Sequence, residues 1–433
     1  MNVQTPRPAP DIIVVGLGAV GSAVTHHLAR RGAQVLGLDR YHPPHEHGSS
    51  HGRTRITRLA VGEGAAYVPL VLRSHQLWRE LEDAGHAPEG PLYRRTGGLV
   101  IGSAAADAGA FHGQAGFFAR TVALARQFGI AHELLDAQTV RQRHPQFLLR
   151  DDESAYFEPE AGVLAPERCV AAQLAAAAAS GAHVSYGERV LSLQASASGV
   201  TLQTDRRLLH AAQVVLTAGA WVPGLAGPPF AQRLVVQRQV LHWFRTTTPA
   251  LWSDTRCPTF IWLHGPTLED AMYGFPMGDG VDGVKVATEQ IRLHCDPDAV
   301  ERQVTPAEAQ ALLDSHVRGR LAGIEPVPMA AATCLYTSTA DGQFIIDRHP
   351  EMPALTVVSA CSGHGFKHSA GLGEALAQQL LGETPHASLA PFAGFAPLAP
   401  LAPLAPFAPP ALFAPLAPLA PPAPPAASAS GAD

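Results

Sequence analysis

The sequence predicts a mixed α/β (α+β) protein, in which a Rossmann-like nucleotide-binding domain carries an inserted domain built on an antiparallel sheet. Three observations predict this class. A strand, a glycine turn, a helix and a second strand succeed one another at residues 12–39. Another apolar strand leads into a helix at 355–381. Between them, alternating apolar and polar stretches at 89–149 and 237–334 are typical of antiparallel strands mixed with helices.

The first element is a dinucleotide-binding βαβ unit. Its parts are expected at 12–15 (strand), 16–21 (turn), up to about 30 (helix) and 34–38 (strand). Gly16 permits the tight turn, Gly18 lets the backbone approach a pyrophosphate, and Gly21 lets helix and strand pack closely. Asp39 closes the second strand, where a carboxylate accepts hydrogen bonds from ribose hydroxyls.

The remaining elements predict a discontinuous arrangement of two domains. A helix is expected at 165–180 and an apolar strand within 211–219. The nucleotide domain is assembled from three pieces, at 10–88, 150–236 and 335–390. The substrate domain takes the segments between them, at 89–149 and 237–334. From 391 to 433 the chain repeats Ala-Pro-Leu, and prolines this frequent predict an extended or disordered tail.

Composition excludes several functional classes. The 433 residues are 46% hydrophobic and 16% charged, as in ordinary globular proteins of two or three domains. A formal charge of −6 argues against nucleic-acid binding. Residues 1–10 lack the apolar segment of a signal peptide, and five scattered cysteines without a C-x-x-C pair fit a reducing cytoplasm and give no zinc site. We expect a cytoplasmic protein with no nucleic-acid or membrane partner and no metal.

A second glycine-rich segment, "SACSGHGFKHSAG" at 359–371, follows the late strand and opens the late helix. Bare backbone amides and a lysine at a helix start suit an anion. A nucleoside triphosphate is excluded by spacing, because Lys367 follows Phe366 instead of a glycine. No second Gly-x-Gly-x-x-Gly occurs, which leaves an NAD-dependent dehydrogenase or a flavoenzyme reduced by its own substrate.

Three segments, at 43–78, 334–350 and 362–376, resemble the monomeric sarcosine oxidase and N-methyltryptophan oxidase family. The resemblance covers about 10–390. Members of this family are FAD-dependent amine oxidases with the D-amino-acid-oxidase-like fold, so the resemblance implies FAD. It also implies a chain that acts as a monomer.

The resemblance assigns roles at the flavin. Cys334 matches the cysteine that forms a thioether to the flavin, which implies covalent FAD. Lys285 matches the lysine over the flavin face where O₂ reacts, since an ammonium stabilises the developing superoxide anion. Arg55 and His51 match residues beside the flavin. Read without the family, a lone buried cysteine is a small hydrophobe and a strand-end lysine faces solvent.

The resemblance also assigns the substrate pocket. Arg58 and Lys367 match the two cations that hold the substrate carboxylate, a task suited to the paired donors of a guanidinium. Tyr273 and Phe275 would line the pocket around the N-alkyl group. Two further matches, Gly363 and His364, would lie at the pyrimidine side of the flavin.

The implied reaction is oxidation of a secondary α-amino acid by FAD, with N-methyl or cyclic substrates such as sarcosine or N-methyltryptophan. O₂ accepts the electrons to give H₂O₂, and loss of an N-methyl group gives formaldehyde. Two residues depart from the family. Glu289 stands where sarcosine oxidases have a histidine, and it would face a longer or cationic substrate or the solvent. Arg53 replaces an acidic residue. A flavin dehydrogenase with another acceptor and an NAD-dependent dehydrogenase are the alternatives.

Overall fold

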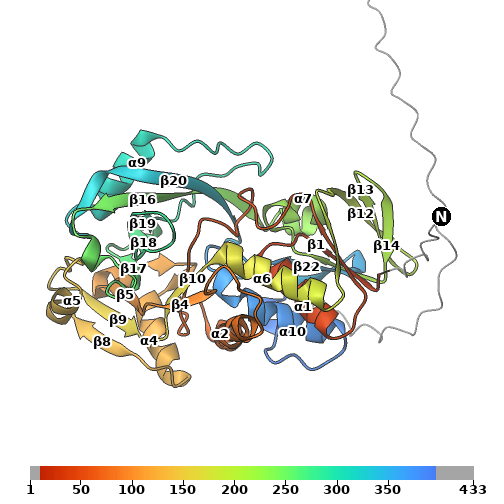
Figure 1. Cartoon of the computed structure of the whole chain (residues 1–433), viewed down its shortest axis with the longest axis horizontal. Coiled ribbons are helices and arrows are strands. Elements are labelled where there is room, and N and C mark those ends of the chain that lie inside the picture. Colours follow the sequence, from red (N-terminus) through yellow and green to blue (C-terminus); the bar gives the residue numbers. More distant parts are fainter. Residues whose placement is uncertain (1–9, 396–433) are drawn as a thin grey trace, which may run out of the picture.

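The computed structural model describes residues 10–395, which form two large sheets lying side by side (Figure 1). The first is six-stranded. In spatial order its strands are β11 (His183–Tyr186), β2 (Val35–Asp39), β1 (Ile12–Val15), β15 (Gln213–Leu216), β22 (Met352–Ser359) and β21 (Ile345–His349). All neighbours pair in parallel except β21, which is antiparallel to β22.

The centre of this sheet is apolar on both faces, as the sequence of β1 requires. All four of its residues are buried, which is typical of a parallel strand covered by helices. Helix α1 (Ala19–Arg30) packs against α6 (Pro166–Ala179) and α10 (Ser369–Leu380), and α10 packs against α2 (Val68–Asp83). The βαβ unit and the late strand–helix pair therefore meet in one layer, although more than 300 residues separate them.

The second large sheet has eight strands. In spatial order they are β20 (Ile324–Ser338), β16 (Val235–Thr246), β19 (Val284–Ala287), β18 (Ala271–Phe275), β17 (Thr259–Leu263), β5 (Gly98–Gly102), β9 (Ser154–Glu158) and β8 (Glu133–Asp136). Only the β17–β5 pair is parallel. The mixed α/β class with an antiparallel-rich second sheet is thus confirmed.

Smaller elements join the two sheets. Three short sheets contain β3 (Arg55–Thr57), β10 (Gly162–Leu164) and β4 (Tyr93–Arg95); β12 (Val190–Ser196), β13 (Gly199–Thr204) and β14 (Leu208–Ala211); and β6 (Ala110–Phe111) with β7 (Gln114–Ala115). The other helices are α3 (Ala104–Asp107), α4 (Phe117–Gln127), α5 (Ala137–Arg143), α7 (Val222–Ala226), α8 (Pro228–Ala231) and α9 (Pro306–Leu312).

The sheets do not follow the predicted domain boundaries at every point. Strand β9 lies in the segment 150–236 that was predicted for the nucleotide domain, yet it pairs with β5 and β8 in the eight-stranded sheet. Strand β20 continues to Ser338, past the predicted boundary at 334. Both differences arise because strand pairing depends on distant partners, whereas the boundaries were drawn from local pattern.

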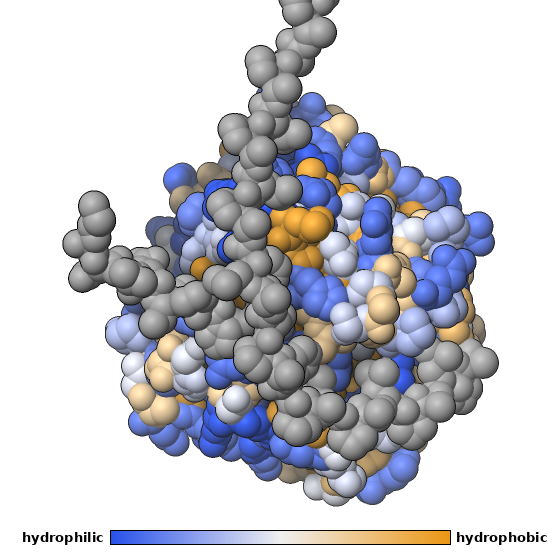
Figure 2. All heavy atoms as spheres, turned by 90° about the vertical axis from the view of Figure 1, so that its right-hand side faces the viewer, coloured by the Kyte–Doolittle hydropathy of each residue, from blue (hydrophilic) through white to orange (hydrophobic). Residues whose placement is uncertain are grey.

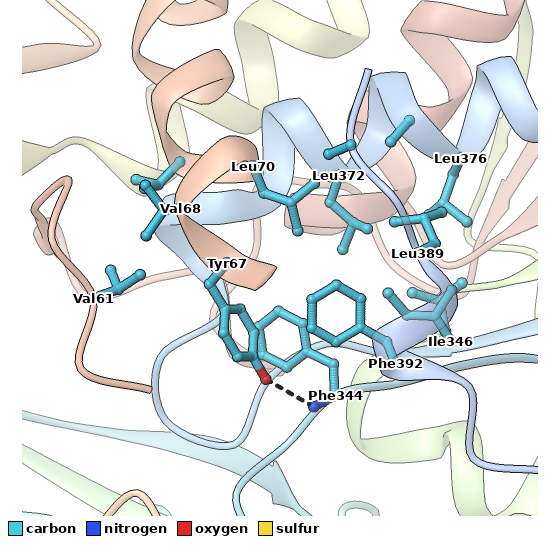
Figure 3. Close-up of a cluster of buried hydrophobic side chains, with 14 of the residues drawn as sticks. Val61, Tyr67, Val68, Leu70, Phe344, Ile346, Leu372, Leu376, Leu389 and Phe392 are labelled. Carbon is cyan, nitrogen blue, oxygen red and sulfur yellow. Dashed lines mark hydrogen bonds between the residues drawn. The ribbon is translucent and has the colours of Figure 1, made fainter. Parts of the chain in front are cut away.

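The predicted tail also begins too early. Its first residues pack on the core, because the Phe392 side chain is 2% exposed and its ring centre lies 4.9 Å from that of Tyr67 and 5.7 Å from that of Phe344. Figure 3 shows these three rings together, with the Tyr67 hydroxyl accepting a hydrogen bond from the backbone N–H of Phe344. Burial of an aromatic ring outweighs the alanine–proline composition around it. The predicted disorder of 396–433 lies outside the described residues.

The outer surface is mostly polar on the face that Figure 2 shows, where hydrophobic residues form only small groups. Within residues 10–395, none of the helices is long and apolar enough to cross a membrane.

We predict that Phe392→Ala lowers the free energy of unfolding by about 3–5 kcal/mol, since it removes a fully buried ring and leaves a cavity. Urea unfolding followed by circular dichroism measures the change. Leu208→Ala is the control, because Leu208 is 49% exposed and its loss should change stability by less than about 0.5 kcal/mol. Equal effects of the two substitutions would show that 390–395 adds nothing to the core.

Candidate active site

A large cavity of about 750 Å³ is lined by residues of both sheets. It begins at the carboxyl ends of β1 and β2, where Gly16, Gly18 and Asp39 line it. It ends among side chains of the second sheet and of the loop before α10, where Arg58 and Lys367 line it. The position agrees with the rule that open α/β sheets bind ligands beyond the carboxyl ends of their strands.

At the β1 end of the cavity, backbone atoms pack closely against Gly16 and Gly21. A Cβ atom on Gly21 would lie 1.8 Å from the Gly16 carbonyl oxygen, and one on Gly16 would lie 2.6 Å from Ala218 Cα. Gly16 also has a φ of +89°, which side chains disfavour. The turn therefore requires glycine at both positions, and Gly21 acts in packing without lining the cavity.

Asp39 braces this turn from the end of β2. Its Oδ2 accepts a hydrogen bond of 2.8 Å from the Leu17 N–H, and its Oδ1 accepts one of 2.8 Å from the Tyr41 N–H. Sequence analysis missed Ser50, whose Oγ accepts from the Ala19 N–H at 3.1 Å and lies 3.2 Å from where a Cβ on Gly18 would be. A serine 29 residues beyond Gly21 gives no local signal of that contact.

The middle of the cavity contains Cys334 and Arg55. Cys334 lies on β20, opposite Gln239 of β16, and its side chain lines the cavity although it is only 1% exposed. Burial raises the pKa of its thiol, against the opposing effect of Arg55 and Lys285. Arg55 donates hydrogen bonds to the Ser49 and Thr54 carbonyl oxygens at 2.6 and 2.8 Å, which fixes its guanidinium at the cavity wall.

Lys285 lies beside this wall but does not line the cavity. Its Nζ donates to the Gly52 carbonyl at 2.6 Å and to Thr54 Oγ1 at 3.0 Å. The ring of Phe275, its cross-strand neighbour, lies 4.7 Å from Nζ. Burial and the nearby Arg55 lower the pKa of Lys285 to about 7. The ammonium thus loses its proton easily, an unusual property for a lysine.

His51 is likewise buried behind the wall. Its Nε2 has no hydrogen-bond partner among the described residues, and burial, followed by Arg55 and Lys285, lowers its pKa to about 3. The ring is therefore neutral at physiological pH. Arg53 remains largely on the surface and binds the Asp279 carbonyl oxygen, away from the cavity.

The far end of the cavity is organised by a residue that sequence analysis missed, Glu63. Its side chain is fully buried, and Arg58 Nη2 donates to both of its oxygens, at 2.8 and 3.0 Å. Lys367 Nζ lies 3.3 Å from Glu63 Oε1 and donates to the His364 carbonyl at 2.8 Å. Burial opposes ionisation of Glu63, but Arg58 and Lys367 outweigh it and hold its pKa well below the usual range.

His112 joins Glu63 to Glu289. Its Nδ1 lies 3.2 Å from Glu63 Oε1, and its Nε2 lies 2.5 Å from Glu289 Oε1. Burial disfavours the imidazolium, but the Glu289 and Glu63 carboxylates outweigh burial and raise the pKa of His112 to about 9. His112 follows β6 in a short hairpin, and nothing in its local sequence indicates this contact. Glu289 faces the cavity and not the solvent.

Aromatic side chains and one glycine complete this end. Tyr273 and Phe275 are two apart on β18, so both reach the cavity from one face of the strand. The Tyr273 hydroxyl lies 3.4 Å from that of Tyr336. Gly363 has a φ of +78°, and a Cβ there would lie 2.8 Å from Glu289 Oε1 and 2.9 Å from Tyr336 Cε2. His364 lines the cavity beside it and bonds the Gly342 carbonyl through Nε2 at 2.9 Å.

Both lysines of the chain lie at this site. The chain has only two lysines, Lys285 and Lys367, and both are buried at this cavity. All other strong cations are arginines. Across residues 10–395, His, Cys, Asp and Glu side chains form no group of three or more that would hold a metal ion.

Comparisons with known proteins agree with this geometry. Residues 11–379 match the family described as FAD dependent oxidoreductase. The chain is 37% identical to a monomeric sarcosine oxidase of Streptomyces avermitilis, covering 88% of this chain and 96% of that protein. It is 33% identical to an N-methyl-L-tryptophan oxidase of Salmonella typhimurium, covering 88% and 97%. The structure superposes on NikD, an unusual amino acid oxidase essential for nikkomycin biosynthesis, with a TM-score of 0.75 and 25% identity, covering 92% of this chain and 100% of NikD.

We predict that His112→Gln flattens the dependence of stability on pH. The pKa of His112 is raised in the folded protein, so its stabilising contribution is complete below about pH 6.5 and is lost as the pH rises through 9. The titratable groups around the ring are Glu63, Glu289, His364 and, through Glu63, Arg58 and Lys367.

Urea unfolding at pH 6.5 and pH 10 measures this difference. Between these values the wild type should lose roughly 3 kcal/mol more than the variant. The neighbouring groups titrate in both proteins, so they largely cancel in the comparison. Parallel pH profiles would contradict a charged His112.

Proposed function

Because the chain belongs to the FAD-dependent oxidoreductase family, we propose that it oxidises a secondary α-amino acid, N-methyl or cyclic, with O₂ as the electron acceptor and H₂O₂ as a product. The observation that supports this most is the large cavity. Its lining includes the glycine turn after β1, Cys334 and the pair of buried cations Arg58 and Lys367.

The residues of the cavity fit FAD. At the β1 end, Gly18 lines the cavity without a side chain, so a pyrophosphate can approach its backbone closely. Toward the middle, Thr337 Oγ1 is buried at the cavity without any partner among the described residues. Such an atom needs a hydrogen bond from a bound group. When bound, FAD accepts two electrons from a C–N bond and passes them to O₂.

Arg58 and Lys367 are proposed to bind the substrate carboxylate. Together with Glu63 they have a net charge of +1, which matches one monoanion. The Glu63 carboxylate fixes both cations, so the substrate meets donors that are already oriented. Tyr273 and Phe275 would exclude water from the N-alkyl group and the reacting carbon.

Lys285 is proposed to supply positive charge where O₂ is reduced. Its Nζ is held by Gly52 and Thr54 within the wall, next to Arg55, and can gain or release a proton near neutral pH. His51 would contribute a neutral wall beside it. Gly363 and His364 would support the anionic edge of the cofactor through the loop before α10. A monomeric, cytoplasmic protein remains our prediction.

Cys334 is proposed to attach FAD covalently through a thioether to its 8α carbon. The bond replaces one S–H and one C–H bond, and the two electrons released pass through the flavin to O₂. Burial raises the pKa of the Cys334 thiol, and Arg55 and Lys285 act against burial toward the thiolate that this reaction needs.

We predict that flavin stays with the protein pellet after acid precipitation of the wild type and moves to the supernatant for Cys334→Ser. Absorbance of the two fractions measures the result. The matched control is Cys361→Ser, because Cys361 lines the same cavity and its loss should leave the flavin in the pellet. Free flavin from the wild type would disprove covalent attachment and leave the oxidase proposal intact.

We also predict that Lys367→Met raises the KM for an N-methyl amino acid on the order of 10- to 100-fold, since one charged hydrogen bond to the carboxylate is lost. Steady-state H₂O₂ release measures KM. This variant is preferable to Arg58→Ala, because Arg58 would still neutralise Glu63.

Flavin content should stay at the wild-type level in Lys367→Met. Arg318→Met, which removes an exposed cation, serves as the control and should leave KM unchanged. An unchanged KM in Lys367→Met would exclude this residue from carboxylate binding. Flavin reduction without H₂O₂ would instead favour a dehydrogenase with another acceptor.

A further inference from the structure

Glu289 presents to the cavity a carboxylate oxygen, Oε2, that has no hydrogen-bond partner among the described residues. Its side chain is 8% exposed and lines the cavity just beyond the end of β19. Oε1 accepts a hydrogen bond from His112 Nε2, whereas no group within residues 10–395 donates to Oε2. Buried carboxylates normally accept several hydrogen bonds, because the lost water must be replaced. A ligand that fills the cavity and displaces its water must therefore supply a donor to Oε2.

Glu289 has fewer cationic partners than Glu63. His112 is the only group that donates to it in the described chain, and the same imidazole ring also faces Glu63. Glu63 has two further cations, Arg58 and Lys367, whereas Glu289 has none within hydrogen-bond distance. Glu289 is therefore the carboxylate of this cluster with fewer cationic partners, and Arg58 and Lys367 concentrate positive charge at Glu63.

Aromatic rings lie near the Glu289 carboxylate. The position of a Cβ on Gly363 lies within 3 Å of both Glu289 Oε1 and Tyr336 Cε2, so the carboxylate and the Tyr336 ring are neighbours. Tyr273 adjoins Tyr336 through their hydroxyls. A carboxylate beside aromatic faces is a combination that binds ammonium and guanidinium groups, through a charged hydrogen bond and cation–π attraction.

We propose that Glu289 is a specificity-determining residue that binds a second, cationic nitrogen of the substrate through Oε2. This inference rests on the proposed function and narrows it to secondary amino acids with a basic side chain. The substrate carboxylate binds Arg58 and Lys367, and the basic group binds at Glu289. The reacting C–N bond lies between these two anchors, so both ends of the substrate are oriented at once.

Two substrates of equal shape test this. Nα-methyl-L-lysine carries the second cation, and Nα-methyl-L-norleucine is its analogue without it. For the wild type, kcat/KM for the lysine derivative should exceed that for the norleucine derivative by at least about 10-fold, mainly through KM. In Glu289→Gln the amide oxygen can still accept from His112, so the fold is kept, and the preference should fall to about 2-fold or less. Glu351→Gln, at an exposed position, should retain the preference.

Binding gives a readout that is independent of turnover. In a second pair of compounds sulfur replaces the α-nitrogen, so neither compound can be oxidised as an amine. The holoenzyme should show a larger rise in Tm with the thioether analogue of the lysine derivative, which keeps the side-chain amino group, than with the analogue of the norleucine derivative. This difference in Tm should vanish in Glu289→Gln.

The outcomes separate the two proposals. Equal kcat/KM for the lysine and norleucine derivatives, or a preference that persists in Glu289→Gln, overturns the role of Glu289 while oxidation itself upholds the proposed function. Failure of every N-methyl amino acid to reduce the flavin overturns the proposed function. In that case the thioether pair still decides on Glu289, because equal stabilisation by both compounds contradicts cation binding and unequal stabilisation supports it.

Discussion

The buried carboxylate of Glu63 is the contact on which the far end of the cavity depends. It joins three segments that are distant in sequence, namely the loop after β3 through Arg58, the β6–β7 hairpin through His112, and the loop before α10 through Lys367. Removing a carboxylate from water costs several kcal/mol unless cations replace the water. The three segments must therefore converge on Glu63 together, and their convergence gives the cavity its shape.

This convergence explains the glycine-rich segment at 359–371. Its lysine is directed inward by Glu63 and by the carbonyl of His364, and Gly363 leaves room for Glu289 and Tyr336. The segment thus faces a cavity that is lined by charged groups of both signs. At the opposite end, the glycine turn and Asp39 form the other part of the cavity wall. Both ends are parts of one cavity because β1 and β22 belong to the same sheet.

For Lys285 the sequence indicated the site but not the contacts that hold the side chain. The chain contains only two lysines, and both are buried beside the cavity. The family resemblance assigned both of them to the site. It did not indicate that Lys285 would be held inside the wall by Gly52 and Thr54, because these residues lie 233 and 231 positions away and meet β19 only after the sheets assemble.

The sequence by itself determined the βαβ unit, the late strand–helix pair and the mixed α/β class. Steric demands on glycine and the periods of helix and strand act over a few residues, so they can be read locally. Only the tertiary structure decided the ionic partners. His112 lies 49 residues from Glu63 and 177 from Glu289. Whether such groups meet, and which remain charged, depends on burial away from water, a property that arises only when distant segments pack together.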